Sequence, residues 1–190
     1  MHKKREVTVW MITRKAQGGL VVLKLMDGDL VIPFFASLDE VQSIVKGYDA
    51  PVLKRLSMHD LVLELVHQMG LVLLQVEVYA IKNNIFYTKL FFSGIVSDPE
   101  KEGTGNTILS VHSRPADAVA LAVRSKCPLY VSQGVLEQVG VPVACFTDGI
   151  ERLEGDWLDM LPLSREQDYT GPGVPYWRSL EPEVTLAREV

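Results

Sequence analysis

The sequence predicts an α+β fold: a mixed, largely antiparallel sheet with three to four helices packed on it. Strand-like segments follow one another directly and are joined by turn signals, as at Asp27-Gly28, a dipeptide that favours hairpins. Helical segments stand between groups of strands and do not alternate regularly with single strands, as they would in a doubly wound sheet. Hydrophobic residues make up 47% of the chain and the mean hydropathy is +0.13, which supplies a substantial core.

The first part of the chain is expected to form a three-stranded meander followed by two helices. The expected strands are at residues 6–13, 20–26 and 30–35. Ser37 and Glu40 have the spacing of a capping box, which opens a helix that ends at Gly47. A second helix is expected from about residue 58 to residue 69, with Ser57 as its N-cap.

The second part is expected to begin with two long strands at residues 71–81 and 85–96, joined by the tight turn Lys82-Asn83-Asn84. Residues 97–106 read as a polar loop, and residues 107–112 as the strand that leads into the next helix. Beyond that helix, a short strand at residues 128–131 and a short helix at residues 132–139 complete the expected elements.

Pro115 marks the start of a helix that is apolar on nearly every side. Proline suits the first helical position because its missing N–H would be unpaired there, so Arg114 is expected as the N-cap. Only Asp117 and Arg124 fall on one polar line along this helix. Its apolar positions are Ala118, Val119, Leu121, Ala122 and Val123. Such a helix belongs in the middle of a domain, so its two charges must reach a cleft, a partner subunit or a neighbouring element.

Charge and composition divide the chain into two parts. Residues 1–146 hold 15 lysines and arginines and 14 acidic residues, a net charge of +1. Residues 147–190 hold 4 lysines and arginines and 10 acidic residues, a net charge of −6. They also include Gly171-Pro172-Gly173. We expect a folded domain over residues 1–146 and an acidic, Pro/Gly-containing C-terminal extension over residues 147–190. The nearly neutral body neither requires nor excludes binding to a polyanion.

A cytoplasmic location without a membrane partner is the expectation from the apolar segments and the cysteines. No run approaches the roughly 18 to 20 apolar residues that cross a bilayer. The basic start is not followed by the apolar segment of a signal peptide. Cys127 and Cys145 lack a metal-like spacing, so we expect two reduced, buried thiols.

Two polar clusters at helix starts are the candidate sites of chemistry. The first is His59-Asp60, preceded by Lys54-Arg55, and the second is Arg114-Pro115-Ala116-Asp117. A carboxylate with an imidazole can hold a divalent cation and activate water, and a nearby arginine can clamp a phosphate. Together these residue types point to phosphate-ester chemistry.

Each of these residues also has an ordinary structural explanation. Asp60 and Asp117 lie in first helical turns, where a carboxylate favours the helix dipole. Arg114 and Asp117 are three residues apart on a helix and can pair with each other. His59 lies at the border of an apolar stripe, where a hydrogen-bonded packing role is common. The residues alone leave both interpretations open.

The chain also resembles the bifunctional nuclease domain family. Residues 114–124, Arg-Pro-Ala-Asp-Ala-Val-Ala-Leu-Ala-Val-Arg, resemble its core Arg-Pro-Ser-Asp-Ala-Ile-Ala-Leu-Ala-(Leu/Val)-Arg. His59-Asp60-Leu61 is similar to the family's Thr-His-Asp-Leu element. Further similar segments are Ile32-Pro33, Phe86-Tyr87 and residues 128–131. Their order and spacing agree over roughly residues 7–140.

The resemblance implies an α+β domain that is often oligomeric, with nuclease activity on both RNA and DNA reported for some members. It places His59, Asp60, Arg114 and Asp117 at motif positions and Arg124 in a supporting position. The chain departs from the family pattern at several points: His112 stands where the family usually has Asp, Ala116 where it usually has Ser and Met58 where it usually has Thr, and the family's Gly-Glu is absent around Phe35-Ala36.

Two functional hypotheses follow. In the first, the protein is a nuclease acting on RNA or DNA. Asp60 and Asp117 then hold a divalent cation such as Mg²⁺ or Mn²⁺, His59 is the general acid or base, and Arg114 orients a phosphate. Arg55 and Arg124 are the substrate-binding candidates. In the second hypothesis, the protein is a non-catalytic homo-oligomeric module with a regulatory or scaffolding role. The same charges then form salt bridges within a helix bundle or across a subunit interface.

Overall fold

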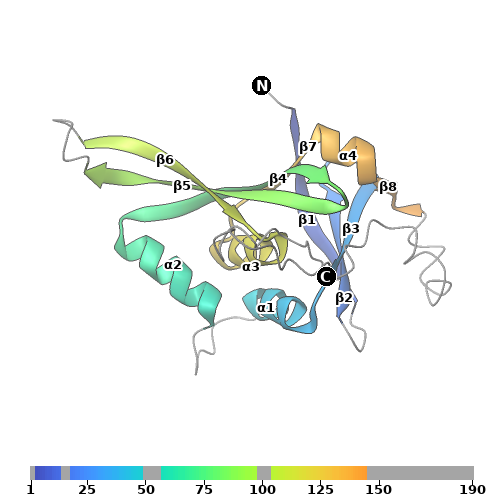
Figure 1. The fold of residues 1–190 in the computed structure, drawn as a ribbon, viewed down its shortest axis with the longest axis horizontal. Helices are drawn as coiled ribbons and strands as arrows, with labels where there is room; N and C mark the ends of the chain where they lie inside the picture. The colour runs from blue at the N-terminus through green and yellow to red at the C-terminus, as the bar shows by residue number, and fades with distance from the viewer. Residues whose placement is uncertain (1–2, 14–17, 49–56, 98–103, 145–190) are drawn as a thin grey trace, which may run out of the picture.

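The computed structural model describes residues 3–13, 18–48, 57–97 and 104–144, and it has the α+β architecture that the sequence predicts (Figure 1). Within these ranges the chain forms one sheet of eight strands and four α-helices. In chain order the elements are β1 (Lys4–Ile12), β2 (Gly19–Leu25), β3 (Leu30–Ala36), α1 (Leu38–Tyr48), α2 (Met58–Gln68), β4 (Leu71–Lys82), β5 (Ile85–Ser97), β6 (Thr104–Ser113), α3 (Pro115–Ser125), β7 (Leu129–Ser132), α4 (Gln133–Val139) and β8 (Val141–Pro142).

The strand order β6-β5-β4-β7-β1-β2-β3-β8 joins two antiparallel meanders through one short strand. β1, β2 and β3 form the first meander, and β4, β5 and β6 form the second. β7 lies between them, antiparallel to β1 and parallel to β4. Strands that run in the same direction require a crossover connection, and α3 supplies it between β6 and β7.

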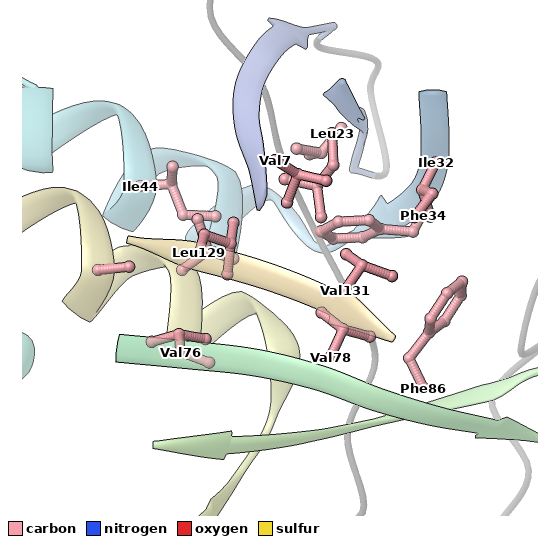
Figure 2. Packing of buried hydrophobic residues seen from close by; sticks show 14 of the residues in the cluster. Val7, Leu23, Ile32, Phe34, Ile44, Val76, Val78, Phe86, Leu129 and Val131 are labelled. Atoms are coloured by element: carbon pink, nitrogen blue, oxygen red, sulfur yellow. The ribbon is translucent and has the colours of Figure 1, made fainter. Parts of the chain in front are cut away.

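The hydrophobic core lies inside a curled sheet. Figure 2 shows Val78 and Val131 of the central strands facing the side of the core that holds Ile32 and Phe34. The rings of Phe34 in β3 and Phe86 in β5 have centroids 6.2 Å apart, although four strands separate β3 from β5 in the sheet order. The sheet therefore bends around its own core, and α1, α2 and α3 lie together beside the β4–β5–β6 strands (Figure 1).

α3 occupies the middle of the domain, as its apolar sequence predicts. Its residues from Pro115 to Ala122 are buried, with the exception of half-buried Asp117. Alanine side chains let a neighbouring helix come close to α3. A Cβ atom at Gly47 of α1 would lie only 3.0 Å from Nη1 of Arg124 and 3.1 Å from Cγ1 of Val123. The close approach of α1 and α3 thus depends on a glycine.

Two local predictions were wrong at element ends, and one short strand was not predicted. Gly47 does not end α1, which continues to Tyr48, because this glycine serves the α1–α3 contact. β6 begins at Thr104, inside the segment predicted as a loop, because its backbone pairs with β5 as far as Ser97. The short strand β8 was not predicted, and it forms by pairing with Leu30 and Val31 of β3.

Some of the expected features lie outside the residues that the structure describes. Arg55, Cys145 and the whole extension over residues 147–190 lie outside the described residues. Cys127 is a free, half-buried thiol, and burial raises its pKa above the ordinary value. Among the described residues, no helix has both the length and the apolar composition to span a membrane.

Candidate functional site

α2 begins with a capping box that uses one of the candidate residues. Ser57 is the N-cap, and its hydroxyl accepts a hydrogen bond from the backbone N–H of Asp60. In return, Oδ2 of Asp60 accepts from the backbone N–H of Ser57 at 2.8 Å and from its hydroxyl. Asp60 therefore has the structural role expected of a first-turn acid, and only its Oδ1 atom is left for another partner.

That partner is Arg124, from the last turn of α3. Its Nε donates to Oδ1 of Asp60 at 2.9 Å, and its Nη2 donates to the Ser57 hydroxyl at 3.3 Å. The remaining Nη1 donates to the carbonyl oxygen of Ala120 at 2.9 Å. Only 7% of the Arg124 side chain is exposed, and 25% of the Asp60 side chain. This ion pair fastens the start of α2 to the end of α3.

The pKa of Asp60 reflects these contacts. Burial alone would raise the pKa, but the hydrogen bonds from Ser57 and the charge and hydrogen bond of Arg124 outweigh it. The pKa of Asp60 therefore lies below its ordinary value, and the carboxylate is ionised at neutral pH.

His59 joins α2 to the start of α3 and to α1. Its Nε2 lies 3.0 Å from Oδ1 of Asp117, and its Nδ1 lies 2.8 Å from the hydroxyl of Ser43. Because a carboxylate only accepts hydrogen bonds, Nε2 is assigned the proton, and Nδ1 of the neutral ring then accepts from Ser43. The His59 side chain is 15% exposed and the Asp117 side chain 40% exposed. Asp117 is thus the member of this chain of contacts that solvent reaches most easily.

Arg114 lies beside Asp117 and is held by α1. Its guanidinium forms an ion pair with Glu40, and its Nε lies 3.9 Å from Oδ2 of Asp117. Glu40 is only 10% exposed, whereas Arg114 is 35% exposed. The other oxygen of Glu40 accepts from the backbone N–H of Ser37 at 2.9 Å, as in the predicted capping box. Glu40 therefore links the first turn of α1 to the start of α3.

The structure brings His59 of the first cluster together with Arg114 and Asp117 of the second, where side chains from the first turns of α1, α2 and α3 meet. The polar line on α3 faces α2, because Asp117 contacts His59 and Arg124 contacts Asp60. The sequence did not indicate that Glu40 and Ser43 contact the candidate site residues Arg114 and His59. Both lie on one face of α1, three residues apart, but the capping box already explained Glu40, and a single helical serine is a weak signal.

The predicted metal ligands, Asp60 and Asp117, already have hydrogen-bond partners. Both oxygens of Asp60 accept hydrogen bonds from Ser57 or Arg124, and Oδ1 of Asp117 contacts His59. Within the described residues, no group of three or more His, Cys, Asp or Glu side chains is arranged to hold a metal ion. The donor set in this arrangement does not fit a site built on both aspartates. The divalent cation stays a prediction.

A separate hollow of about 420 Å³ lies along the other flank of α3. It is lined mainly by β1 and by the end of α3, including Glu6, Lys126 and Cys127. None of His59, Asp60, Arg114 and Asp117 lines it. The hollow and the polar cluster are therefore different features of the domain.

Comparison with known proteins agrees with the motifs in these helices. Residues 21–144, which include His59, Asp60, Arg114 and Asp117, match the family model of the bifunctional nuclease domain. The chain belongs to the bifunctional nuclease domain family. An uncharacterized protein of Mycobacterium tuberculosis is 28% identical over 125 residues, which cover 64% of this chain and 66% of that protein.

Two plant relatives are named as bifunctional nucleases. Bifunctional nuclease 1 of Oryza sativa subsp. japonica is 23% identical over 149 residues, which cover 78% of this chain and 43% of the rice protein. A bifunctional nuclease of Oryza minuta has the same identity and coverage. The matched part of the chain thus spans just under two thirds of the mycobacterial protein and less than half of each rice protein.

Proposed function

We propose that this domain hydrolyses phosphodiester bonds in RNA or DNA, with His59 and Asp117 as an acid–base pair and Arg114 as the phosphate contact. The observation that carries the proposal is the 3.0 Å contact between Nε2 of His59 and Oδ1 of Asp117, beside a half-exposed arginine. Membership in the bifunctional nuclease domain family supports the class of reaction.

The roles of His59 and Asp117 follow from the exposure of their side chains and from their hydrogen bonds. Hydrolysis requires a group that takes a proton from the attacking water and returns one to the leaving oxygen. Asp117 faces solvent, so its carboxylate can take the proton from the attacking water and return it to the leaving oxygen, while the Nε2–H of His59 donates to the same carboxylate from behind. Ser43 holds the ring from its other nitrogen at 2.8 Å and fixes its orientation.

Arg114 supplies the positive charge that a phosphate needs. Its guanidinium has five N–H donors in a planar fork, and Glu40 engages only one side of it. Arg124 was also a substrate-binding candidate, but all of its nitrogens have partners inside the domain and its side chain is almost fully buried. We therefore propose Arg114 as the phosphate contact and Arg124 as a support for the site.

The test uses two histidines on the same helix. His59→Gln removes the imidazole of the acid–base pair, whereas His67→Gln changes an exposed histidine near the other end of α2. We expect cleavage of labelled single-stranded RNA and DNA to fall by about 100-fold or more for His59→Gln, as for loss of a general acid or base. His67→Gln should cleave at the wild-type rate.

Asp117→Asn should show a similar loss, and parallel reactions with EDTA show whether a divalent cation takes part. Equal cleavage by the wild type, His59→Gln and Asp117→Asn would identify the activity as a contaminant and overturn the proposal. Circular dichroism of each variant shows whether the fold is intact.

A second candidate function is a homo-oligomeric regulatory or scaffolding module, and an exposed apolar stripe on α2 favours it. No residue of α2 is fully buried, and one side of the helix carries four exposed apolar side chains. They are Met58 at 71%, Leu61 at 42%, Leu65 at 54% and Met69 at 68% exposed, the last just beyond the helix end. Their spacing of three to four residues forms a continuous stripe, which typically marks an interaction surface.

Leu65→Glu tests this candidate. A second copy of the chain would cover the stripe, and a carboxylate in its middle would cost several kcal/mol if buried without a partner. We expect the wild type to sediment as an oligomer and Leu65→Glu to sediment as a monomer. Glu64→Gln, at an exposed neighbouring position, is the control and should not change the mass. A monomeric wild type would contradict the oligomer without affecting the nuclease proposal.

A further inference from the structure

The sheet carries tyrosines and lysines on the face that points away from α3. In β5, Tyr87 stands between the buried side chains of Phe86 and Thr88, so it points to the opposite face. In the cross-strand register, Lys89 of β5 lies opposite His112 of β6 and Glu77 of β4. Residues directly opposite in a sheet share a face, so these side chains form a row on the outer side of the sheet.

The rings and charges on this face contact one another. Nζ of Lys89 lies 4.8 Å from the ring centroid of Tyr79, and Nζ of Lys82 lies 5.9 Å from that of Tyr87. The two tyrosine rings have centroids 6.2 Å apart, and the ring of His112 lies 5.8 Å from Tyr79. We call Tyr79, Lys82, Tyr87, Lys89 and His112 the tyrosine–lysine cluster.

The cluster has surplus positive charge. Glu77 is the acid opposite Lys89 in the register, but it is 16% exposed and also lies 3.9 Å from the ammonium group of Lys4. Lys82 and His112 are exposed and Lys89 is half-buried. The region around the two tyrosine rings therefore presents two ammonium groups to solvent, with one acid that is already paired.

We propose that the tyrosine–lysine cluster binds single-stranded nucleic acid, with bases stacked on the tyrosine rings and phosphates beside Lys82 and Lys89. Aromatic rings interleaved with cations suit unpaired bases on a charged backbone, whereas bases stacked inside a duplex cannot reach the rings. This inference rests on the proposed nuclease function and specifies its substrate as single-stranded.

The cluster is also close to the candidate active site along the chain. His112 belongs to the cluster, and only Ser113 separates it from Arg114, the proposed phosphate contact. β6 is an edge strand of the sheet, so the outer face and the start of α3 meet at its end. A nucleic-acid strand bound on the cluster would have to pass the end of β6 to reach the acid–base pair, because the cluster lies on the face of the sheet that points away from α3.

The experiment measures the binding of fluorescein-labelled oligouridylate by fluorescence anisotropy, in the wild type and in a His59→Gln background that leaves the probe uncut. The test variant is Lys82→Gln/Lys89→Gln. The matched control is Lys46→Gln/Lys126→Gln, which removes two exposed lysines near the C-terminal ends of α1 and α3. Both variants make the same change in net charge.

The test variant should bind more weakly, and the slope of log Kd against log salt should fall by about 1.4, because each lost phosphate contact on a single strand removes roughly 0.7. The control should keep the wild-type slope. Tyr87→Leu should weaken binding by roughly tenfold, since stacking is lost, and leave the salt slope unchanged.

Equal slopes for the test and control variants, or equal affinity of the wild type for the oligonucleotide and for a duplex of the same length, would overturn the inference. The two proposals fail separately. Loss of cleavage in His59→Gln with no effect of the cluster variants contradicts only the binding surface. Normal cleavage by His59→Gln with cluster-dependent binding contradicts only the catalytic assignment.

Discussion

Arg124 illustrates how a charge serves the fold at the scale of one residue. All three of its nitrogens have partners within the domain, and these partners belong to α2, its N-cap and α3. Lysine has a single ammonium group and cannot reproduce this fork. We expect Arg124→Lys to lower the free energy of unfolding by about 2 kcal/mol, and Arg124→Met, which leaves Asp60 unpaired, by about 3 kcal/mol.

Urea unfolding measures these losses, and Arg5→Met is the matched control. Arg5 also pairs with an aspartate, Asp27, at 2.8 Å, but the Asp27 side chain is 68% exposed. Solvent screens an exposed pair, so its contribution to stability is small. Equal losses in Arg5→Met and Arg124→Met would show that the buried ion pair does not fasten α2 to α3.

At the scale of elements, the starts of the helices were predicted well from local sequence patterns. The capping box at Ser37, the N-cap at Ser57 and the helix start at Pro115 are confirmed, because a cap depends on residues three positions apart. The end of α1 was predicted wrongly, because a glycine stop signal cannot be distinguished from a glycine required by a neighbouring helix. The extra length of β6 likewise comes from its pairing with β5, which no local pattern reports.

The partners of the site residues were beyond a prediction from sequence. The polar line of Asp117 and Arg124 indicated that α3 presents charge to a neighbour, but three kinds of neighbour were possible. The structure shows that the neighbour of both is α2. Glu40 could not be assigned to Arg114, because the two residues are far apart in the chain and meet only when α1 packs against α3.

At the scale of the whole molecule, β7 decides how the two meanders combine. It has only four residues, yet it pairs with β1 and β4, and its Val131 lies beside Val78 of β4, both facing the core (Figure 2). The sequence predicts a short strand there but not its place in the sheet, because a parallel pairing depends on the path of α3. The curl that brings Phe34 to Phe86 follows from this placement.

Acid unfolding tests how far the whole domain depends on the α2–α3 ion pair. The pKa of Asp60 is lower in the folded protein than its ordinary value of 3.8, so its contribution to stability is fully present above that value. The contribution is lost as the pH falls through the lower, folded-state pKa. Asp60→Asn should therefore be less stable than the wild type at neutral pH, and the difference should shrink below about pH 4.

Urea unfolding of both proteins across this range gives the difference directly, with Asp27→Asn as the control. The pKa of Asp27 is also lowered, chiefly by its hydrogen bond with Arg5, but its exposed position leaves solvent to screen the effect. Its stability difference should be small at every pH. If the difference for Asp60→Asn stayed constant down to about pH 3, it would come from the changed shape of the capping box and not from the ionised carboxylate.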